Sequence, residues 1–459
     1  MPTRTNACAL CRKKRIKCDA TLPQCLMCIK FGRICPGPSN GPIIVDMTSA
    51  LANGPKKRKK GRKEAARVTY EALPAEVLSN ITVQISQRNM LNEAFYGNFL
   101  AYFTTTGEGS DLGNRQTWLH RLPDFAADGS NQALHLAVQA TASAFSFAKT
   151  RHIPLMQDAC QLYGRALNQH LHMIRLKKRV TVHTVSTSVL LSIFEAMNST
   201  SASAYRQHIS GAAELVRLAG PDQCWMGIMC QLFFHIRVQM AFVYLTTRQE
   251  DRANVCAEEV LRETLTYWDV PIFQRLIGYM TRLTALYLKL DDSKDRAMPD
   301  LLGLEEYARI KAGVDALWLE YKLDAEQQGQ RLYWVNSKGT TEYRNAYTAL
   351  CVAYFGSARA LFGILAPSLM ASYVDVTDYY QQILDIAEYL TTFKIGCAFM
   401  RMATPLYLVA MHGKRKEQID TAVSIFERWR VIGLGGISAL ALESIYRRRG
   451  MNGAGLAVR

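Results

Sequence analysis

Six cysteines between residues 8 and 35 constrain this chain more than any other feature of its sequence. Their spacing reads C-x2-C-x6-C-x6-C-x2-C-x6-C, so the second three cysteines repeat the pattern of the first three. Each C-x2-C pair can place two thiolates on one metal ion at the start of a helix, and the third cysteine follows after about two helical turns and a reversal. The pattern predicts a small zinc-stabilised module with two short helices. Its ligands are Cys8, Cys11, Cys18, Cys25, Cys28 and Cys35.

The number of cysteines predicts how the metal is shared. A structural zinc ion takes four ligands, so two separate ions would need eight thiolates, and the segment offers only six. Two zinc ions can share six thiolates if two of them bridge both ions, and the symmetry of the pattern assigns the bridging to Cys8 and Cys25. The alternative is a six-cysteine disulfide framework, which an oxidising compartment would favour.

Positive charge is concentrated near the cysteines. Residues 1–70 hold 16 Lys/Arg and three acidic residues, so they carry +13 of the total net charge of +16. The chain as a whole is 49% hydrophobic and 20% charged, which is typical of a folded protein with a sizeable core. A basic end on a near-neutral body indicates an arm that binds a polyanion.

The sequence favours an intracellular protein without a membrane segment. Its first residues are polar and are followed by basic ones, unlike a secretory signal. The two most apolar stretches, Leu232–Leu245 and Leu350–Leu365, are interrupted by Arg237 and Arg359, and we expect both to be buried helices. In a reducing compartment, clustered cysteines bind metal more often than they form disulfides.

The six cysteines are accompanied by the basic string of residues 12–17 between Cys11 and Cys18, and by Pro23, two residues before Cys25. On these features, residues 6–36 resemble the fungal binuclear zinc-cluster (Zn2Cys6) transcription factors. The resemblance implies that each of two zinc ions is held by four cysteines. One set is Cys8, Cys11, Cys18 and Cys25, and the other is Cys25, Cys28, Cys35 and Cys8.

The basic string is the expected reading surface for double-stranded DNA. Residues Cys11–Lys17 are expected to form a short helix, and zinc modules of this class place such a helix in the major groove. Guanine offers the acceptors O6 and N7 there, which Lys and Arg fit. The resemblance implies a CGG/CCG-like triplet, base contacts from Lys14 and Arg15, and phosphate contacts from Arg12, Lys13 and Lys17. The alternatives are a solvated basic face and a zinc module without a role in DNA binding.

A second basic run lies in residues 37–70, whose prolines and glycines predict a flexible linker. Seven of the eight residues at positions 56–63 are basic, which indicates a nuclear import signal and therefore a nuclear protein. A solvated linker or extra phosphate contacts are the other interpretations. The residues are Lys56, Lys57, Arg58, Lys59, Lys60, Arg62 and Lys63.

Residues 71–450 are expected to form a large all-α domain. Apolar residues recur at helical spacing, as in Leu134, Val138, Thr141, Phe145 and Ala148, in Val185, Val189, Ile193 and Ala196, and in Ala422, Phe426, Trp429 and Ile432. Gly220-Pro221 indicates the end of one helix, and Pro271, Pro299, Pro367 and Pro405 are expected near the boundaries of others.

Two segments of this domain resemble the fungal-specific transcription factor domain. They are His208–Pro221 and the stretch from Thr404-Pro405-Leu406-Tyr407 with Ala410 to the helix through Trp429. The resemblance implies a regulatory domain that senses a small-molecule effector or binds transcriptional co-regulators. Ordinary helix packing explains the same residues, with Ala212, Leu215, Val216 and Ala219 as a core face and Gly220 as a C-cap.

Smaller features carry less weight. His170 and His172 have the spacing of a metal pair, but structural or surface histidines are the commoner case. The scattered cysteines are expected to be small core residues. They are Cys160, Cys224, Cys230, Cys256, Cys351 and Cys397.

These features together favour a transcription factor that regulates RNA polymerase II genes. The sequence holds no hydrolase or kinase signature, so we do not expect an enzyme. The alternatives are a protein–protein adaptor or co-regulator whose zinc module does not bind DNA, and an enzyme with a nucleic-acid-targeting zinc arm. A sustained heptad repeat is missing between Cys35 and Phe103, so a homodimer and a monomer both stay open.

Overall fold

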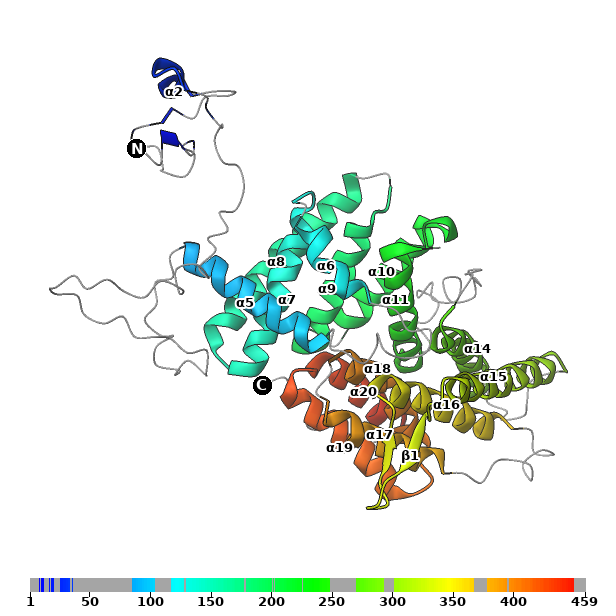
Figure 1. The fold of residues 1–459 in the computed structure, drawn as a ribbon. Helices are drawn as coiled ribbons and strands as arrows, with labels where there is room; N and C mark the ends of the chain where they lie inside the picture. The colour runs from blue at the N-terminus through cyan, green and yellow to red at the C-terminus, as the bar shows by residue number, and fades with distance from the viewer. Residues whose placement is uncertain are drawn as a thin grey trace. The chain divides into compact units, whose positions relative to one another are not determined.

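The computed structural model of the chain divides into two units, Met1–Leu73 and Pro74–Arg459, and each is treated by itself below. We call them the N-terminal unit and the body (Figure 1). Within the N-terminal unit, the structure describes residues 8, 10–11, 16, 18–19, 25–33 and 35. Within the body it describes residues 85–103, 117–127, 129–176, 179–199, 201, 203–224, 226–247, 270–292, 301–366, 378–393 and 396–449.

The described residues of the N-terminal unit include the short helix α2 (Leu26–Lys30), whose start is fixed by a cysteine. Leu10 and Cys11 are also helical, but residues 12–15 and 17 of the predicted helix Cys11–Lys17 lie outside the described residues. Cys25 is the N-cap residue of α2, and its Sγ accepts a hydrogen bond from the Cys28 backbone N–H at 3.4 Å. The cap therefore places the C-x2-C pair at the first turn of the helix, as the spacing predicts.

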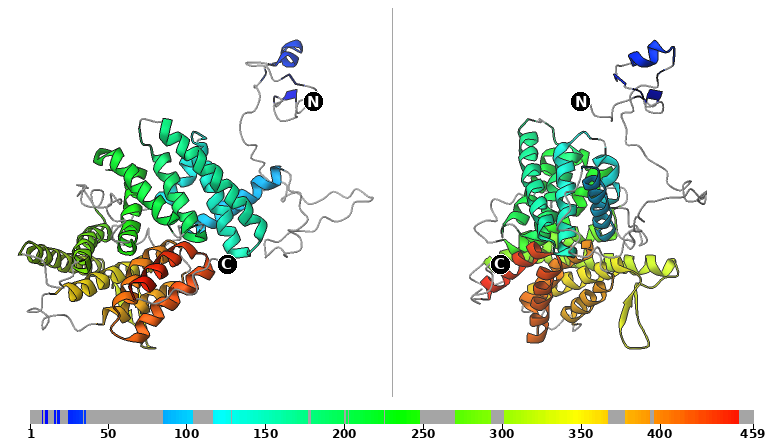
Figure 2. Two further views of the ribbon diagram at one scale, coloured as in Figure 1. Left: turned by 180° about the vertical axis from the view of Figure 1, so that it is seen from behind. Right: turned by 90° about the vertical axis from the view of Figure 1, so that its left-hand side faces the viewer.

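The body is built almost entirely of helices, in agreement with the predicted all-α domain. Its first helices, α5 to α11, lie together, and α16 to α20 lie together beside them (Figures 1 and 2). In chain order the helices are α5 (Ile85–Phe103), α6 (Trp118–Ala126), α7 (Gln132–Thr150), α8 (Ile153–Leu176), α9 (Val182–Asn198), α10 (Ala204–Ala219), the 3-10 turn η2 (Pro221–Gln223), α11 (Gly227–Thr246), α14 (Ile272–Asp292), α15 (Leu301–Gln327), α16 (Ala346–Leu365), α17 (Tyr379–Thr391), α18 (Gly396–His412), α19 (Lys416–Ile432) and α20 (Gly435–Arg448).

The apolar spacings in the sequence mark faces that form the core, apart from Ile432 at the end of α19, which is 47% exposed. In α7, Leu134, Val138 and Phe145 are buried, and in α9 every residue from Thr184 to Met197 is buried. Polar N-caps fix where these helices begin: the Asn131 Oδ1 accepts from the Leu134 N–H at 2.9 Å. Gly220 ends α10 with a φ of 82°, which confirms the predicted C-cap.

The two apolar stretches of the sequence are helices α11 and α16. Both are long and apolar enough to cross a membrane by length and composition, yet 72% and 83% of their most apolar windows are buried inside the body. Arg237 of α11 is itself buried, with its guanidinium 5.3 Å from the centroid of the Phe233 ring. The expectation of buried helices is therefore confirmed.

The prediction for Pro405 is wrong, because this proline lies inside α18 and not near its boundary. Every residue from Gly396 to Ala410 is buried, so tertiary packing overrides the helix-breaking tendency of proline. Pro405 has no N–H for the carbonyl of Arg401, which would be its partner in a regular helix. The Tyr354 hydroxyl donates to that carbonyl instead, at 2.9 Å.

Among the described residues of the body, one hairpin interrupts the helical pattern, and it was not expected from the sequence. Strand β1 (Tyr333–Val335) pairs antiparallel with β2 (Thr341–Tyr343), and Trp334 lies opposite Glu342. The Asn336 side chain closes the turn, because its Oδ1 accepts from the N–H groups of Lys338 and Thr340 at 2.9 and 3.0 Å.

Candidate metal centre

All six predicted cysteine ligands come together in the N-terminal unit. They form two groups of four whose sulfur atoms lie within 4.8 Å of one another. The first group is Cys8, Cys11, Cys18 and Cys25, and the second is Cys8, Cys25, Cys28 and Cys35. Cys8 and Cys25 belong to both groups, and they are the two residues to which the sequence pattern assigns the bridging.

The thiols form the interior of the unit. Cys8 and Cys25 have no exposed surface, and their Sγ atoms are 3.8 Å apart. Cys11 Sγ lies 3.7 Å from Cys25 Sγ, and Cys8 Sγ lies 3.7 Å from Cys28 Sγ. Leu10, Ile16 and Met27 pack against this cluster. The sulfurs thus take the place that a hydrophobic core has in a larger domain.

The two halves of the cluster repeat the same hydrogen bonds at an offset of 17 residues. The Cys11 N–H donates to Cys8 Sγ, and the Cys28 N–H donates to Cys25 Sγ, both at 3.4 Å. The Cys8 N–H donates to Cys18 Sγ at 3.4 Å, and the Cys25 N–H donates to Cys35 Sγ at 3.5 Å. N–H groups that point at sulfur stabilise thiolates, so both halves are prepared for metal in the same way.

Burial disfavours the ionised form of the cluster thiols unless a cation is bound. Burial raises the pKa of Cys11 to about 12, and burial also raises the pKa values of Cys25 and Cys28. Without a cation these thiols would keep their protons at neutral pH. A metal ion that replaces the protons supplies the compensating positive charge. Buried thiolates in groups of four are the ligand set that zinc prefers.

Comparison with protein families agrees with this geometry. Residues 6–39 match the family model described as the fungal Zn(2)-Cys(6) binuclear cluster domain. The N-terminal unit contains a fungal Zn2Cys6 cluster domain. This zinc-cluster domain binds two zinc ions, and the two groups of four thiols are the sites that can hold them. No match of the chain to a curated protein or to a solved structure was found.

The second half of the zinc-cluster domain presents apolar side chains to solvent. In the second half, the exposed side chains of α2 and the turn after it include Leu26, Ile29 and Phe31, which are 62%, 55% and 50% exposed. The Arg33 guanidinium lies 5.1 Å from the centroid of the Phe31 ring. The corresponding segment of the first half is the basic string.

The residues expected to contact DNA and the import machinery lie outside the described residues. The former are Arg12, Lys13, Lys14, Arg15 and Lys17, and the latter are Lys56, Lys57, Arg58, Lys59, Lys60, Arg62 and Lys63. The roles of both sets therefore stay predictions.

One contact in this domain was missed by the sequence analysis. Asp19 Oδ2 accepts from the Leu26 N–H at 3.1 Å, which ties the end of the first half to the first residue of α2. The acidic residue directly after the third cysteine could have indicated such a contact, but the sequence does not show which backbone N–H group its carboxylate reaches.

The structure supports some of the expectations for the other histidines and cysteines and contradicts one of them. His170 is buried and hydrogen-bonds to the Ser188 hydroxyl at 2.8 Å, whereas His172 on the same helix is exposed. Cys224, Cys351 and Cys397 are buried, as expected, but Cys160 is exposed and Cys230 is half-buried. The expectation for Cys160 is wrong because its side chain lies on the outer face of α8. Cys256 lies outside the described residues.

Proposed function

We propose that this chain is a sequence-specific transcription factor that regulates RNA polymerase II genes and reads CGG/CCG-like triplets in the major groove. The matched domain is that of the fungal zinc-cluster DNA-binding regulators, and this observation carries the proposal. Zinc fixes the fold of the domain, and its basic string supplies the contacts to DNA. In this proposal the chain acts as a regulator and not as an enzyme.

The two halves differ in sequence at the positions expected to contact bases, and this difference supports base reading by one half only. The halves share their cysteine scaffold and its hydrogen bonds, so both could present a helix to a groove. At the positions 17 residues after Lys14 and Arg15, the second half has Phe31 and Gly32, which have no side-chain donors for guanine. The first half is therefore the one with the chemistry to read bases.

The other parts of the chain have roles in this proposal. Residues 56–63 act as the nuclear import signal, and the body acts as a regulatory domain of the fungal-specific transcription factor type. Helix α10 and its Gly220 cap cover the first segment that resembles this domain, and the buried α18 begins the second.

The exposed apolar residues of α2 favour one alternative, an adaptor role in which the zinc-cluster domain binds protein and not DNA. Selection of sequences from a random pool of duplex oligonucleotides by the full-length protein distinguishes the two. We expect enrichment of a CGG-like triplet in the presence of zinc and its loss with a zinc chelator. An unenriched pool under both conditions would support the adaptor.

A further inference from the structure

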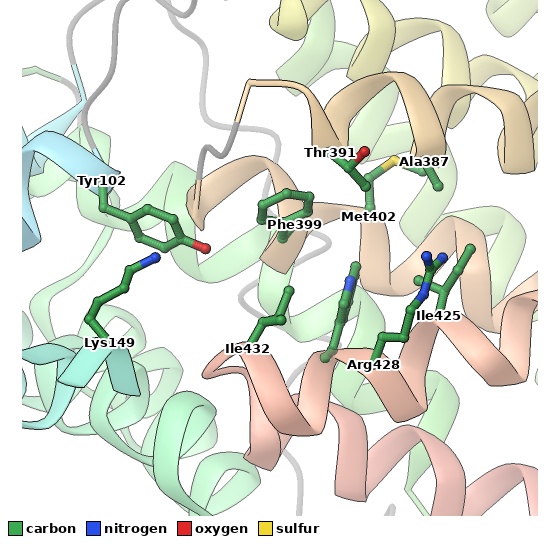
Figure 3. A pocket seen from close by; sticks show the side chains of 10 residues that line it. Tyr102, Lys149, Ala387, Thr391, Phe399, Met402, Ile425, Arg428 and Ile432 are labelled. Carbon is green, nitrogen blue, oxygen red and sulfur yellow. The ribbon is translucent and has the colours of Figure 1, made fainter. Parts of the chain in front are cut away.

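The body contains a cavity of about 380 Å³ between helices that are far apart in the sequence (Figure 3). Residues of α5 and α7 form one end, and residues of α17, α18 and α19 form the rest. The lining side chains belong to Tyr102, Lys149, Ala387, Thr391, Phe399, Met402, Ile425, Arg428, Trp429 and Ile432.

The inner wall of the cavity is apolar and aromatic. Phe399, Met402, Ile425 and Trp429 are all buried, and the Phe399 and Trp429 rings meet edge to face with centroids 6.1 Å apart. A cavity with this wall gains free energy by taking up an apolar or aromatic group, which leaves water in the process.

One end of the cavity carries a cation held by aromatic rings. The Lys149 Nζ lies 4.6 Å from the centroid of the Tyr102 ring and 5.4 Å from that of Phe145. Figure 3 shows the Lys149 amine and the Tyr102 hydroxyl side by side at this end. The two rings restrict the lysine, so less side-chain entropy is lost when an anion binds there.

The Tyr102 hydroxyl is a second donor at the same end. Burial raises the pKa of Tyr102 to about 12, so the hydroxyl keeps its proton at neutral pH. The Tyr102 ring packs directly against α18 at Gly396, where a Cβ atom would collide with the ring. The position of this hydroxyl therefore depends on a glycine in the wall.

A second cation lies at the opposite end of the cavity. Arg428 is 57% exposed, and its guanidinium is 4.0 Å from the Glu388 carboxylate, which is 72% exposed. Among the described lining residues none is acidic. Because the Glu388 carboxylate offsets the charge of Arg428, the Lys149 end of the apolar cavity is the one that suits the charge of an anionic ligand.

Contacts on either side of Lys149 join the end of α7 to the end of α19 beside the cavity. Arg151 donates to the carbonyl of Val431, and Gly433, with a φ of 99°, abuts the side chain of Ala148. A ligand that contacts Lys149 and Trp429 would touch both sides of this junction.

We propose that this cavity binds an amphipathic organic anion, whose aromatic or aliphatic body lies against Phe399 and Trp429 and whose carboxylate or sulfonate lies at Lys149 and the Tyr102 hydroxyl. Its volume lies within the usual range for small-molecule sites, about 300–1,000 Å³. The proposal does not rest on DNA binding by the zinc-cluster domain.

Two fluorescent probes test the site in the full-length protein. 1-Anilinonaphthalene-8-sulfonate has an aromatic body and an anionic head, and N-phenyl-1-naphthylamine has the same body without the charge. The variants are Lys149→Met, which keeps the length of the side chain, and Tyr102→Phe, which keeps the ring beneath Lys149. Lys338→Met, an exposed lysine in the hairpin turn, is the matched control.

We expect one saturable site for the sulfonate probe, about tenfold weaker in Lys149→Met and weaker also in Tyr102→Phe. Binding of the neutral probe should be the same in all variants, and Lys338→Met should behave like the wild type. Equal weakening of both probes would show an apolar patch without anion recognition, and unchanged sulfonate binding in Lys149→Met would overturn the proposal. Neither result depends on whether the protein selects a DNA sequence.

Discussion

Cys8 and Cys25 occupy equivalent positions in the two halves of the zinc-cluster domain, and their sulfur atoms lie 3.8 Å apart. Both are fully buried, and both belong to the two groups of four thiols. The remaining four cysteines each belong to one group only. Loss of a shared cysteine should therefore affect the domain differently from loss of an unshared one.

Zinc content measures this difference. Cys8→Ala removes a ligand from both metal sites, and we expect the purified protein to lose both zinc ions. Cys35→Ala removes a ligand from one site, so more zinc per chain should remain. Zinc per chain is measured by elemental mass spectrometry after dialysis against a weak chelator. Equal zinc contents in the two variants would contradict the shared positions.

Tyr354 and Pro405 should be energetically coupled through the carbonyl of Arg401. Tyr354→Phe leaves this buried carbonyl without its donor, and we expect a loss of about 1–3 kcal/mol in the free energy of unfolding. In a Pro405→Ala background, the alanine N–H can pair with the carbonyl, so the same Tyr354→Phe change should cost less. Chemical denaturation of the four proteins gives the coupling energy. A coupling of zero would show that the hydroxyl does not replace the missing N–H.

Gly436 permits the close approach of α20 to the end of α9. A Cβ atom at this position would meet the carbonyl of Glu195, so Gly436→Ala should destabilise the body by about 1–3 kcal/mol. Gly211 is the matched control, since it is an exposed helical glycine with open space around its Cβ direction. Gly211→Ala should stabilise by about 0.5–1 kcal/mol. If the two variants have the same melting temperature, the α9–α20 contact is not as close as described.

His170 should make the body less stable in acid. Burial, with a smaller effect of the nearby His208, lowers the pKa of His170 to about 4. The unfolded chain, with a histidine pKa near 6.5, therefore binds a proton that the folded protein does not bind between these pH values. Stability should fall as the pH falls through this window, by roughly 2 kcal/mol for this residue.

Denaturation at pH 7 and at pH 4.5 checks this sign. His170→Gln should lose part of the pH dependence, whereas His172→Gln on the exposed face of the same helix should keep all of it. Identical pH profiles for the three proteins would show that His170 is not the group that titrates.

The sequence predicts those features that depend on spacing, and it misses those that depend on a distant partner. The cysteine pattern predicts the six ligands and the shared pair, because a metal needs fixed numbers of donors. The apolar periodicity predicts α7, α9 and α19, because a helix that packs on the core needs apolar residues at fixed helical spacing. The position of Pro405 inside a helix was not predicted, because Tyr354, whose hydroxyl donates to the carbonyl that Pro405 leaves without an N–H, lies 51 residues away in the sequence.

The hairpin and the cavity were also beyond the sequence analysis. Strands β1 and β2 have only three residues each, too few for an alternating pattern to be recognised. The cavity brings together Tyr102, Lys149 and Trp429 from three helices, and no local pattern links these positions. Only the packing of α7 against the end of α19 shows that they meet.

The most direct test of the account is the affinity of the full-length protein for its selected DNA site and for a scrambled duplex, measured at one salt concentration. With zinc bound, we expect Arg15→Ala to lower the preference for the selected site by about 1–3 kcal/mol. Lys30→Ala, an exposed basic residue in the second half, should leave that preference unchanged. An Arg15→Ala variant that binds both duplexes more weakly by the same factor would contradict base reading by the first half of the zinc-cluster domain.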